Sequence, residues 1–170
     1  FAALWQGARA AAWKVGGPSD KVDPTAAPIP PEKLLHSPAS VAGAHMRMLG
    51  VEAEVAFRLV KDLPPRARPY TGRSIMAAVG EVLVAIELCD TRLANWKKTS
   101  GLWKLADFQN NDALVIGSGT RDWQKIDFLT QEVEFIEDGF LVLRDHLNRP
   151  QAARLRPPAK GEPRQGVHDL

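Results

Sequence analysis

The stretch GVEAEVAFRLVKDLP, residues 50–64, combines a strong strand pattern with two acidic residues in its most apolar part. Read with a period of two, as in a β-strand, its residues separate into two faces. One face carries Val51, Ala53, Val55, Phe57 and Leu59, and the other carries Glu52, Glu54, Ala56 and Arg58. Two residues of strand rise place the Cα atoms of Glu52 and Glu54 roughly 6.6 Å apart. Because like charges this close raise each other's pKa, the face is either open to water or built to receive a cation.

A third acidic residue, Glu87, lies in VAIELCD (84–90), a segment apolar and β-branched enough to predict a buried strand. Ionised carboxylates are seldom buried without a partner. Three carboxylates from rigid strands suit a hard divalent cation with oxygen ligands, Mg²⁺ or Mn²⁺, with water at the remaining positions. The residues alone leave a second interpretation open, in which Glu52 and Glu54 form a solvated face and Glu87 pairs with Arg92 or Lys14.

The composition is that of an ordinary globular chain. With 170 residues, of which 45% are hydrophobic and 25% charged, it suits one domain with its own core. Its longest apolar runs, VLVAIEL (82–88) and ALVIG (113–117), are far too short to span a membrane. Cys89 is the only cysteine, which excludes an intramolecular disulfide and a thiolate metal cluster and fits a reducing cytoplasm.

The positive charge belongs to the C-terminal tail. Residues 144–170 contain six Lys or Arg and three Asp or Glu. The preceding 143 residues contain 16 Lys or Arg and 17 Asp or Glu. The body therefore gives no support for nucleic-acid binding. The tail has four prolines and almost no apolar periodicity, so we predict that it is disordered. We therefore divide the chain into a domain over residues 1–143 and a basic, Pro/Arg-rich tail over residues 144–170.

The pattern along the chain predicts an α+β fold with a mixed, mostly antiparallel sheet. Strands are expected at 50–60, 82–90 and 112–119, and a hairpin joins 132–136 to 140–144 through Asp138–Gly139. A short extended piece is expected at 13–20, and a proline-rich loop at 21–40. Helical segments are expected at the end of 1–13, in 71–82 with Ser74 as the N-cap, and around 100–110.

Four segments occur in an order and at intervals that resemble the 2-keto-4-pentenoate hydratase branch of the fumarylacetoacetate hydrolase superfamily. They are WKVG (13–16), GVEAEVAFRLVKDLP (50–64), VAIELCDTRLANW (84–96) and LADFQNNDALVIGSG (105–119). The resemblance runs from about residue 10 to about residue 143. It implies the β-roll of the fumarylacetoacetate hydrolase C-terminal domain, and a cytoplasmic homo-oligomer.

The function implied by the resemblance is a divalent-metal-dependent lyase. It would add water to 2-hydroxypenta-2,4-dienoate to give 4-hydroxy-2-oxopentanoate in aromatic catabolism. Glu52, Glu54 and Glu87 match the family's Mg²⁺ or Mn²⁺ ligands, and Lys14 matches a lysine beside the metal-bound 2-oxo acid. A 2-oxo-3-hexenedioate decarboxylase and a non-catalytic, truncated remnant are the alternatives.

Three further residues are weaker candidates for contact with the small-molecule substrate. Arg92 matches a family arginine, and we expect it to form a structural ion pair that holds Asp90 or Glu87. Asp107 matches a family aspartate that helps to position substrate or water. His36 lies on the proline-rich loop, where an imidazole can act as an acid or a base.

The chain also departs from the family pattern. Phe108 stands where asparagine is usual, and Asp112 stands where a small residue is common. The leading helical segment and the C-terminal strands of the family are not recognisable. We therefore expect a fold that is incomplete at both ends, with an open sheet edge and exposed apolar surface.

Overall fold

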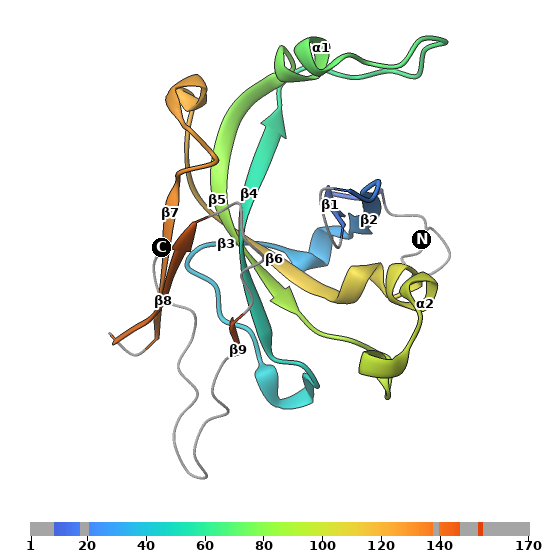
Figure 1. Cartoon of the computed structure of the whole chain (residues 1–170), viewed down its shortest axis with the longest axis vertical. Coiled ribbons are helices and arrows are strands. Elements are labelled where there is room, and N and C mark those ends of the chain that lie inside the picture. The colour runs from blue at the N-terminus through green and yellow to red at the C-terminus, as the bar shows by residue number, and fades with distance from the viewer. Residues whose placement is uncertain (1–8, 18–20, 138–139, 147–152, 155–170) are drawn as a thin grey trace.

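A five-stranded mixed sheet forms the centre of the computed structural model, which describes residues 9–17, 21–137, 140–146 and 153–154 (Figure 1). The strand order is β3-β6-β5-β4-β9, in which β3 and β6 are parallel and the other neighbours are antiparallel. The strands are β3 (Leu34–His36), β6 (Asn111–Thr120), β5 (Val79–Cys89), β4 (Gly50–Leu59) and β9 (Ala153–Arg154). The expected α+β fold with mixed and antiparallel sheets is confirmed.

Two antiparallel ribbons and two short helices complete the described structure. The ribbons pair β1 (Ala12–Gly16) with β2 (Thr25–Ile29), and β7 (Glu132–Glu137) with β8 (Phe140–His146). The second ribbon confirms the predicted hairpin, whose Asp138–Gly139 turn lies outside the described residues. The helices are α1 (Gly72–Met76) and α2 (Gly101–Ala106).

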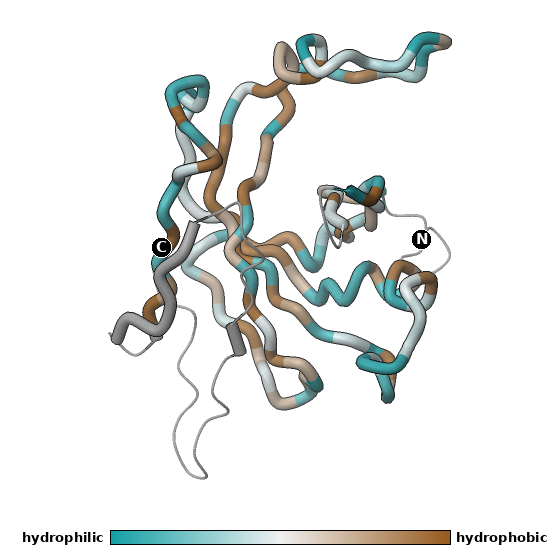
Figure 2. Tube along the Cα trace, viewed as in Figure 1, coloured by the Kyte–Doolittle hydropathy of each residue, from teal (hydrophilic) through white to brown (hydrophobic). Residues whose placement is uncertain are grey.

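Pairing of β4 with β5 sorts their side chains as the alternating pattern predicted. On one face, Val51 and Leu88 join Ala113 and Val115 of β6 in a buried cluster. On the face that carries the glutamates, Leu83 and Ala85 of β5 pack with Ile116 of β6 in a second cluster. Figure 2 shows hydrophobic segments along these central strands and hydrophilic ones at the loop tips. The sheet is therefore apolar on both faces around the polar positions of β4 and β5.

The N-terminal half contains more strand than the sequence predicted. Ala12 and Trp13, expected at the end of a helix, belong to β1, and residues 1–8 lie outside the described part. The expected loop over 21–40 contains β2 and β3, although β2 includes Pro28. Proline lacks a backbone N–H, but a two-stranded ribbon has an edge on which no donor is needed.

The first helix begins earlier and is shorter than predicted. Its N-cap is Thr71, whose side chain accepts a hydrogen bond from the backbone N–H of Ser74, so the expected cap at Ser74 was wrong. The helix ends at Met76, because the chain enters β5 at Val79. None of the helices in the described segments has the length and apolarity needed to cross a membrane.

Part of the predicted tail is ordered into strands. β8 continues through His146, three residues into the predicted tail, and Ala153–Arg154 form β9 against Gly50 and Val51. Residues 144–146 and 153–154 of the predicted tail therefore belong to strands. The other residues of the predicted tail lie outside the described part of the chain. β9 covers a short length of the edge of β4.

Candidate metal centre

The register between β4 and β5 brings the three glutamates to one face of the sheet. Glu52 lies directly opposite Glu87, and Glu54 lies opposite Ala85, one pair further along the same face. Side chains directly opposite each other on antiparallel strands have Cβ atoms about 4.5–5.5 Å apart. Glu54 and Glu87 are diagonal neighbours, still within reach of long side chains. The predicted convergence of acidic residues from two strands therefore follows from backbone pairing.

The tightest group of candidate ligands contains a sulfur as well as carboxylates. Ligand atoms of Glu52, Glu87 and Cys89 all lie within 4.8 Å of one another. Oxygen ligands at about 2.1–2.5 Å from one cation span on the order of 4–5 Å. Glu54 lies outside this group of three but diagonally beside it. Cys89 is buried, and its thiol lies among the carboxylates.

Lys14, from β1, is the ionic partner of Glu87. Its Nζ donates to Glu87 Oε1 at 2.6 Å and to Oε2 at 2.5 Å, and lies 3.9 Å from Glu52 Oε2. Glu87 is only 1% exposed, so it requires such a partner. The pairing of Glu87 with Lys14, which the second interpretation anticipated, is thus present. It places the predicted catalytic lysine beside the predicted metal ligands.

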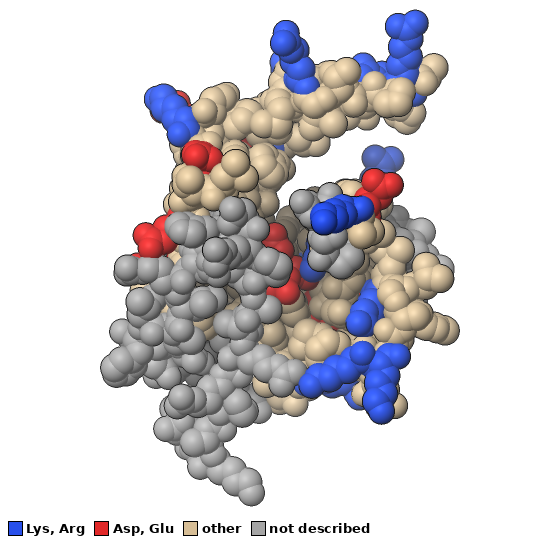
Figure 3. All heavy atoms as spheres, viewed as in Figure 1, with Lys and Arg blue, Asp and Glu red and all other residues tan. Residues whose placement is uncertain are grey.

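The group carries more negative than positive charge. Burial, and then the charge of Glu87, raise the pKa of Glu52 and raise that of Glu54 to about 7. Burial tends to lower the pKa of Lys14, but Glu87 and Glu52 outweigh it, so the pKa is raised and the ammonium persists. Three carboxylates thus face one ammonium. Acidic and basic side chains meet in a recess of the surface in Figure 3. This donor set fits a hard divalent cation.

Asn111 is a further residue of the site that sequence reasoning missed. Its Nδ2 donates to Glu87 Oε1 at 3.1 Å, and its side chain is buried. It is the first residue of β6 and pairs with Cys89 across the ladder. Lys14 donates to both carboxylate oxygens of Glu87 and Asn111 donates to Oε1, so the two donors hold the plane of this carboxylate. The signal in the sequence that could have identified Asn111 is a polar residue at the start of an apolar strand.

Arg92 and Asp107 form a separate network that braces the chain next to the site. Arg92 Nε lies 2.5 Å from Asp107 Oδ1, Nη2 donates to Asp107 O at 2.7 Å, and Nη1 donates to Asn111 O at 3.0 Å. The expected structural ion pair exists, but its partner is Asp107 and not Asp90 or Glu87. Asp90 instead accepts the backbone N–H groups of Arg47 and Met48, at 2.7 Å each.

His36 does not join the acidic group. It ends β3, opposite Ile116, which itself lies opposite Ala85 of β5. It therefore shares the face of the glutamates but lies two strands from β5, roughly 10 Å away. Its side chain is exposed. The prediction that His36 contacts substrate is not tested by this geometry, and its placement on a loop was wrong.

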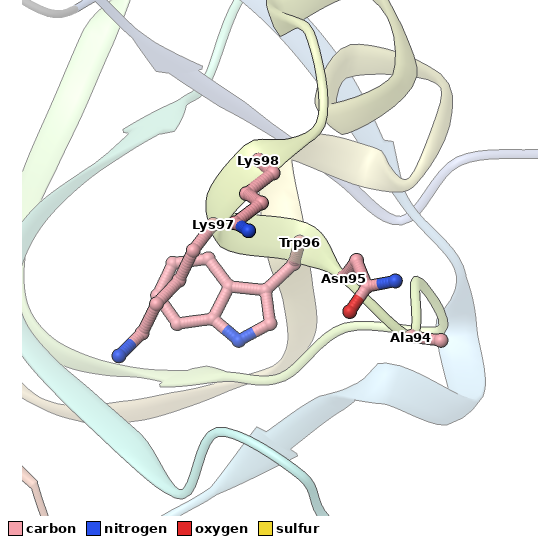
Figure 4. A pocket seen from close by; sticks show the side chains of 5 residues that line it. All are labelled: Ala94, Asn95, Trp96, Lys97 and Lys98. Atoms are coloured by element: carbon pink, nitrogen blue, oxygen red, sulfur yellow. The ribbon is translucent and has the colours of Figure 1, made fainter.

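A hollow elsewhere on the surface has different chemistry. It is lined by Ala94, Asn95, Trp96, Lys97 and Lys98, which form one continuous stretch (Figure 4). Lys97 Nζ lies 5.7 Å from the centroid of the Trp96 ring. Because one segment supplies the whole lining, no groups from distant parts of the described chain converge there. We place the candidate site at the carboxylates.

Comparison with known proteins supports the fold. No protein-family model and no curated protein sequence matches the chain. The fold is similar to that of a known decarboxylase. This is 4-oxalocrotonate decarboxylase from Pseudomonas putida G7, in a structure complexed with magnesium and adipate, with a TM-score of 0.71 and 17% sequence identity. The match covers 84% of this chain and 56% of that one, so the chain spans little more than half of the enzyme's length.

The α+β fold is consistent with the one that the sequence resemblance implied. At this level of identity the similarity concerns the fold. It does not distinguish the hydratase branch from other branches.

Proposed function

We propose that this chain carries the cation-binding part of the active site of a divalent-metal-dependent enzyme that acts on 2-oxo acids. The reaction we favour is the hydration of 2-hydroxypenta-2,4-dienoate to 4-hydroxy-2-oxopentanoate. The observation that carries the proposal is the set of three carboxylates, Glu52, Glu54 and Glu87, on one face of β4 and β5 with Lys14 beside them. The similarity of the fold to a decarboxylase complexed with magnesium supports a metal-dependent enzyme.

The protein residues would divide the work as follows. Glu52, Glu54 and Glu87 would hold Mg²⁺ or Mn²⁺, which supplies Lewis-acid polarisation of a chelated 2-oxo group. Lys14 stays protonated because its pKa is raised. Its ammonium would stabilise the negative charge that grows on the keto oxygen as the substrate enolises, and this lowers the barrier because the charge is larger in the transition state. Asn111 keeps Glu87 oriented.

Decarboxylation of 2-oxo-3-hexenedioate is the second candidate. The similarity to 4-oxalocrotonate decarboxylase favours it. Both reactions would use the same acidic residues and pass through an enolate, so the choice depends on groups that contact the far end of the substrate. A non-catalytic remnant that binds metal without turnover is the third candidate.

The experiment compares both substrates with the purified chain in Mg²⁺ and in Mn²⁺. Loss of dienoate absorbance without release of CO₂ identifies the hydratase, and release of CO₂ from 2-oxo-3-hexenedioate identifies the decarboxylase. E87Q should abolish turnover, whereas E81Q, the same change at a half-buried glutamate of β5 that pairs with Arg58, should retain it. Metal binding without turnover of either substrate would support the non-catalytic remnant. Absence of metal binding would contradict the hydratase, the decarboxylase and the remnant alike.

We also propose that the chain acts as a homo-oligomer in the cytoplasm, without nucleic-acid or membrane partners. Exposed apolar side chains support self-association. Trp13 and Val15 on β1 are each 64% exposed, and Leu102 and Trp103 on α2 are 79% and 63% exposed. Light scattering across a concentration series tests this, and a monomer at all concentrations would contradict it.

A further inference from the structure

Three consecutive residues before β6 adopt a left-handed backbone. Phe108, Gln109 and Asn110 have φ angles of 54°, 58° and 61°. L-amino acids other than glycine visit this region as single residues, because the Cβ atom approaches the next carbonyl oxygen. Such a run persists only where surrounding contacts determine it. The turn lies directly before Asn111, the residue that binds Glu87.

Arg92 holds this turn at both ends. Its guanidinium is paired with Asp107, the residue before the turn, and donates to the carbonyl of Asn111, the residue after it. Its Cζ also lies 5.6 Å from the centroid of the Phe108 ring. Inside the turn, the carbonyl of Asn110 accepts the backbone N–H of Asp90 at 2.9 Å. These contacts explain why an unfavourable backbone is kept here.

The turn directs the side chain of Gln109 to the end of the β1–β2 ribbon at which the connecting loop, residues 17–24, begins and ends. Gln109 Nε2 donates to the carbonyl of Thr25 at 3.1 Å, contacts the carbonyl of Gly16 at 3.4 Å, and bonds to Thr25 Oγ1. Gly16 and Thr25 are the last pair of the ribbon. Two carbonyl oxygens require an N–H donor, so the amide orientation is determined.

The ribbon is anchored on either side of Lys14. On one side Ile29, 1% exposed, is buried opposite Ala12. On the other side the Gly16–Thr25 pair is bound by Gln109, two residues from Lys14. Ala27, which lies opposite Lys14, is also buried. The ammonium can therefore reach Glu87 only while both ends of the ribbon stay in place.

We propose that Gln109 is a positioning residue, which holds the β1–β2 ribbon so that Lys14 stays on Glu87. The left-handed turn thus fixes both partners of Glu87, Lys14 through Gln109 and Asn111 through the backbone. The catalytic consequence rests on the proposed function, because it requires that Lys14 and Glu87 belong to the active site. The claim that Gln109 holds the β1–β2 ribbon does not require the proposed function.

The test uses Q109M, which keeps the length and charge of the side chain but removes its donor. Q124M is the matched control, because Gln124 is exposed. Amide hydrogen exchange in β1 and β2 should become about 5- to 10-fold faster in Q109M, the size expected for one or two lost hydrogen bonds. Exchange in β4 and β5 should not change, which shows that the variant folds. T25V, which removes one acceptor, should give a smaller change in the same direction.

A second readout tests whether Gln109 acts through Lys14. Removing an ammonium from Glu87 strengthens divalent-cation binding, because the two cations compete for one carboxylate. Q109M should therefore bind Mn²⁺ several-fold more tightly than the unmodified chain, and K14M should do the same. Adding Q109M to K14M should then change Mn²⁺ affinity no further.

Unchanged exchange in the ribbon of Q109M would overturn the proposal. An equal effect of Q109M in the K14M background would also overturn it, because Gln109 would then act without Lys14. If the unmodified chain binds no Mn²⁺, the proposed function fails. The hydrogen-exchange measurement alone then decides whether Gln109 holds the β1–β2 ribbon.

Discussion

Lys14 and Glu87 are 73 positions apart in the sequence, yet Lys14 Nζ lies 2.5 Å from Glu87 Oε2. This contact joins the β1–β2 ribbon to the central sheet at the point where β4 and β5 present their acidic residues. It also gives the almost fully buried Glu87 the cation that it needs. The same carboxylate is a candidate metal ligand, so an internal ammonium and an external cation share it.

K14M should destabilise the metal-free protein, because it leaves the Glu87 carboxylate buried without its partner. Removing one partner of a buried pair costs about 3 kcal/mol. Mn²⁺ should then stabilise K14M more than it stabilises the unmodified chain, because the metal replaces the missing charge. Thermal unfolding with and without Mn²⁺ measures both effects. K125M is the control, since Lys125 and Asp122 form an exposed pair, and equal melting of K14M and the unmodified chain in chelator would contradict the prediction.

The metal-free protein should lose stability as the pH rises from about 4.5 to about 7. The pKa of Glu54 is raised from 4.5 to about 7 in the fold, first by burial and then by the charge of Glu87. In this window the folded state holds more protons than the unfolded state, so its stability falls with increasing pH. E54Q removes the ionisable group and should flatten this dependence. Urea unfolding at several pH values tests it, with E32Q as a control at an exposed glutamate, and an unchanged pH profile in E54Q would oppose it.

D107N should weaken the fold, because the Asp107 carboxylate is buried and accepts three hydrogen bonds. The donors are the side chain of Arg92, the backbone N–H of Arg92 and the hydroxyl of Thr91. The expected loss is about 2 kcal/mol of unfolding free energy, the scale of hydrogen bonds to a charged group. D122N is the same change in an exposed pair and should cost less than about 1 kcal/mol. Equal denaturation midpoints for the two variants would show that the Arg92–Asp107 network does not hold the left-handed turn.

Cys89 should resist thiol reagents in the folded protein. Burial and the charge of Glu87 raise the pKa of its thiol, which lowers the share of reactive thiolate. Its reaction with a disulfide reagent at pH 8 should be slower than in urea by a factor on the order of 100 or more. Rapid labelling under native conditions would show that the thiol is not enclosed among the carboxylates.

The site could be predicted where it depends on local pattern. Alternation along 50–59 assigned the faces of β4, and an acidic residue in an apolar run identified Glu87. The pairing of Glu52 with Glu87 follows from the β4–β5 register, which is antiparallel and continuous from Gly50 to Arg58. The faces of β4 come from short-range periodicity, which the sequence shows directly, whereas the residues alone left the convergence of the glutamates open and the resemblance implied it.

The remaining features depend on contacts between distant segments. β2 and β3 lie in a proline-rich stretch, and only their partners β1 and β6 make them strands. The roles of Gln109 and Asn111 depend on a left-handed turn that Phe108 and Gln109 do not favour, although Asn110 tolerates it. Such a backbone arises from the Arg92 network and cannot be read from propensity.

The most direct test of the account is the position of Mn²⁺ in a crystal of this chain, located by its anomalous scattering. We predict one strong peak between β4 and β5, with oxygen atoms of Glu52, Glu54 and Glu87 at roughly 2.2 Å from it, and no peak in crystals of E87Q. A Mn²⁺ peak bound elsewhere, or crystals at millimolar Mn²⁺ with no peak at these carboxylates, would contradict the assignment of a metal-dependent active site.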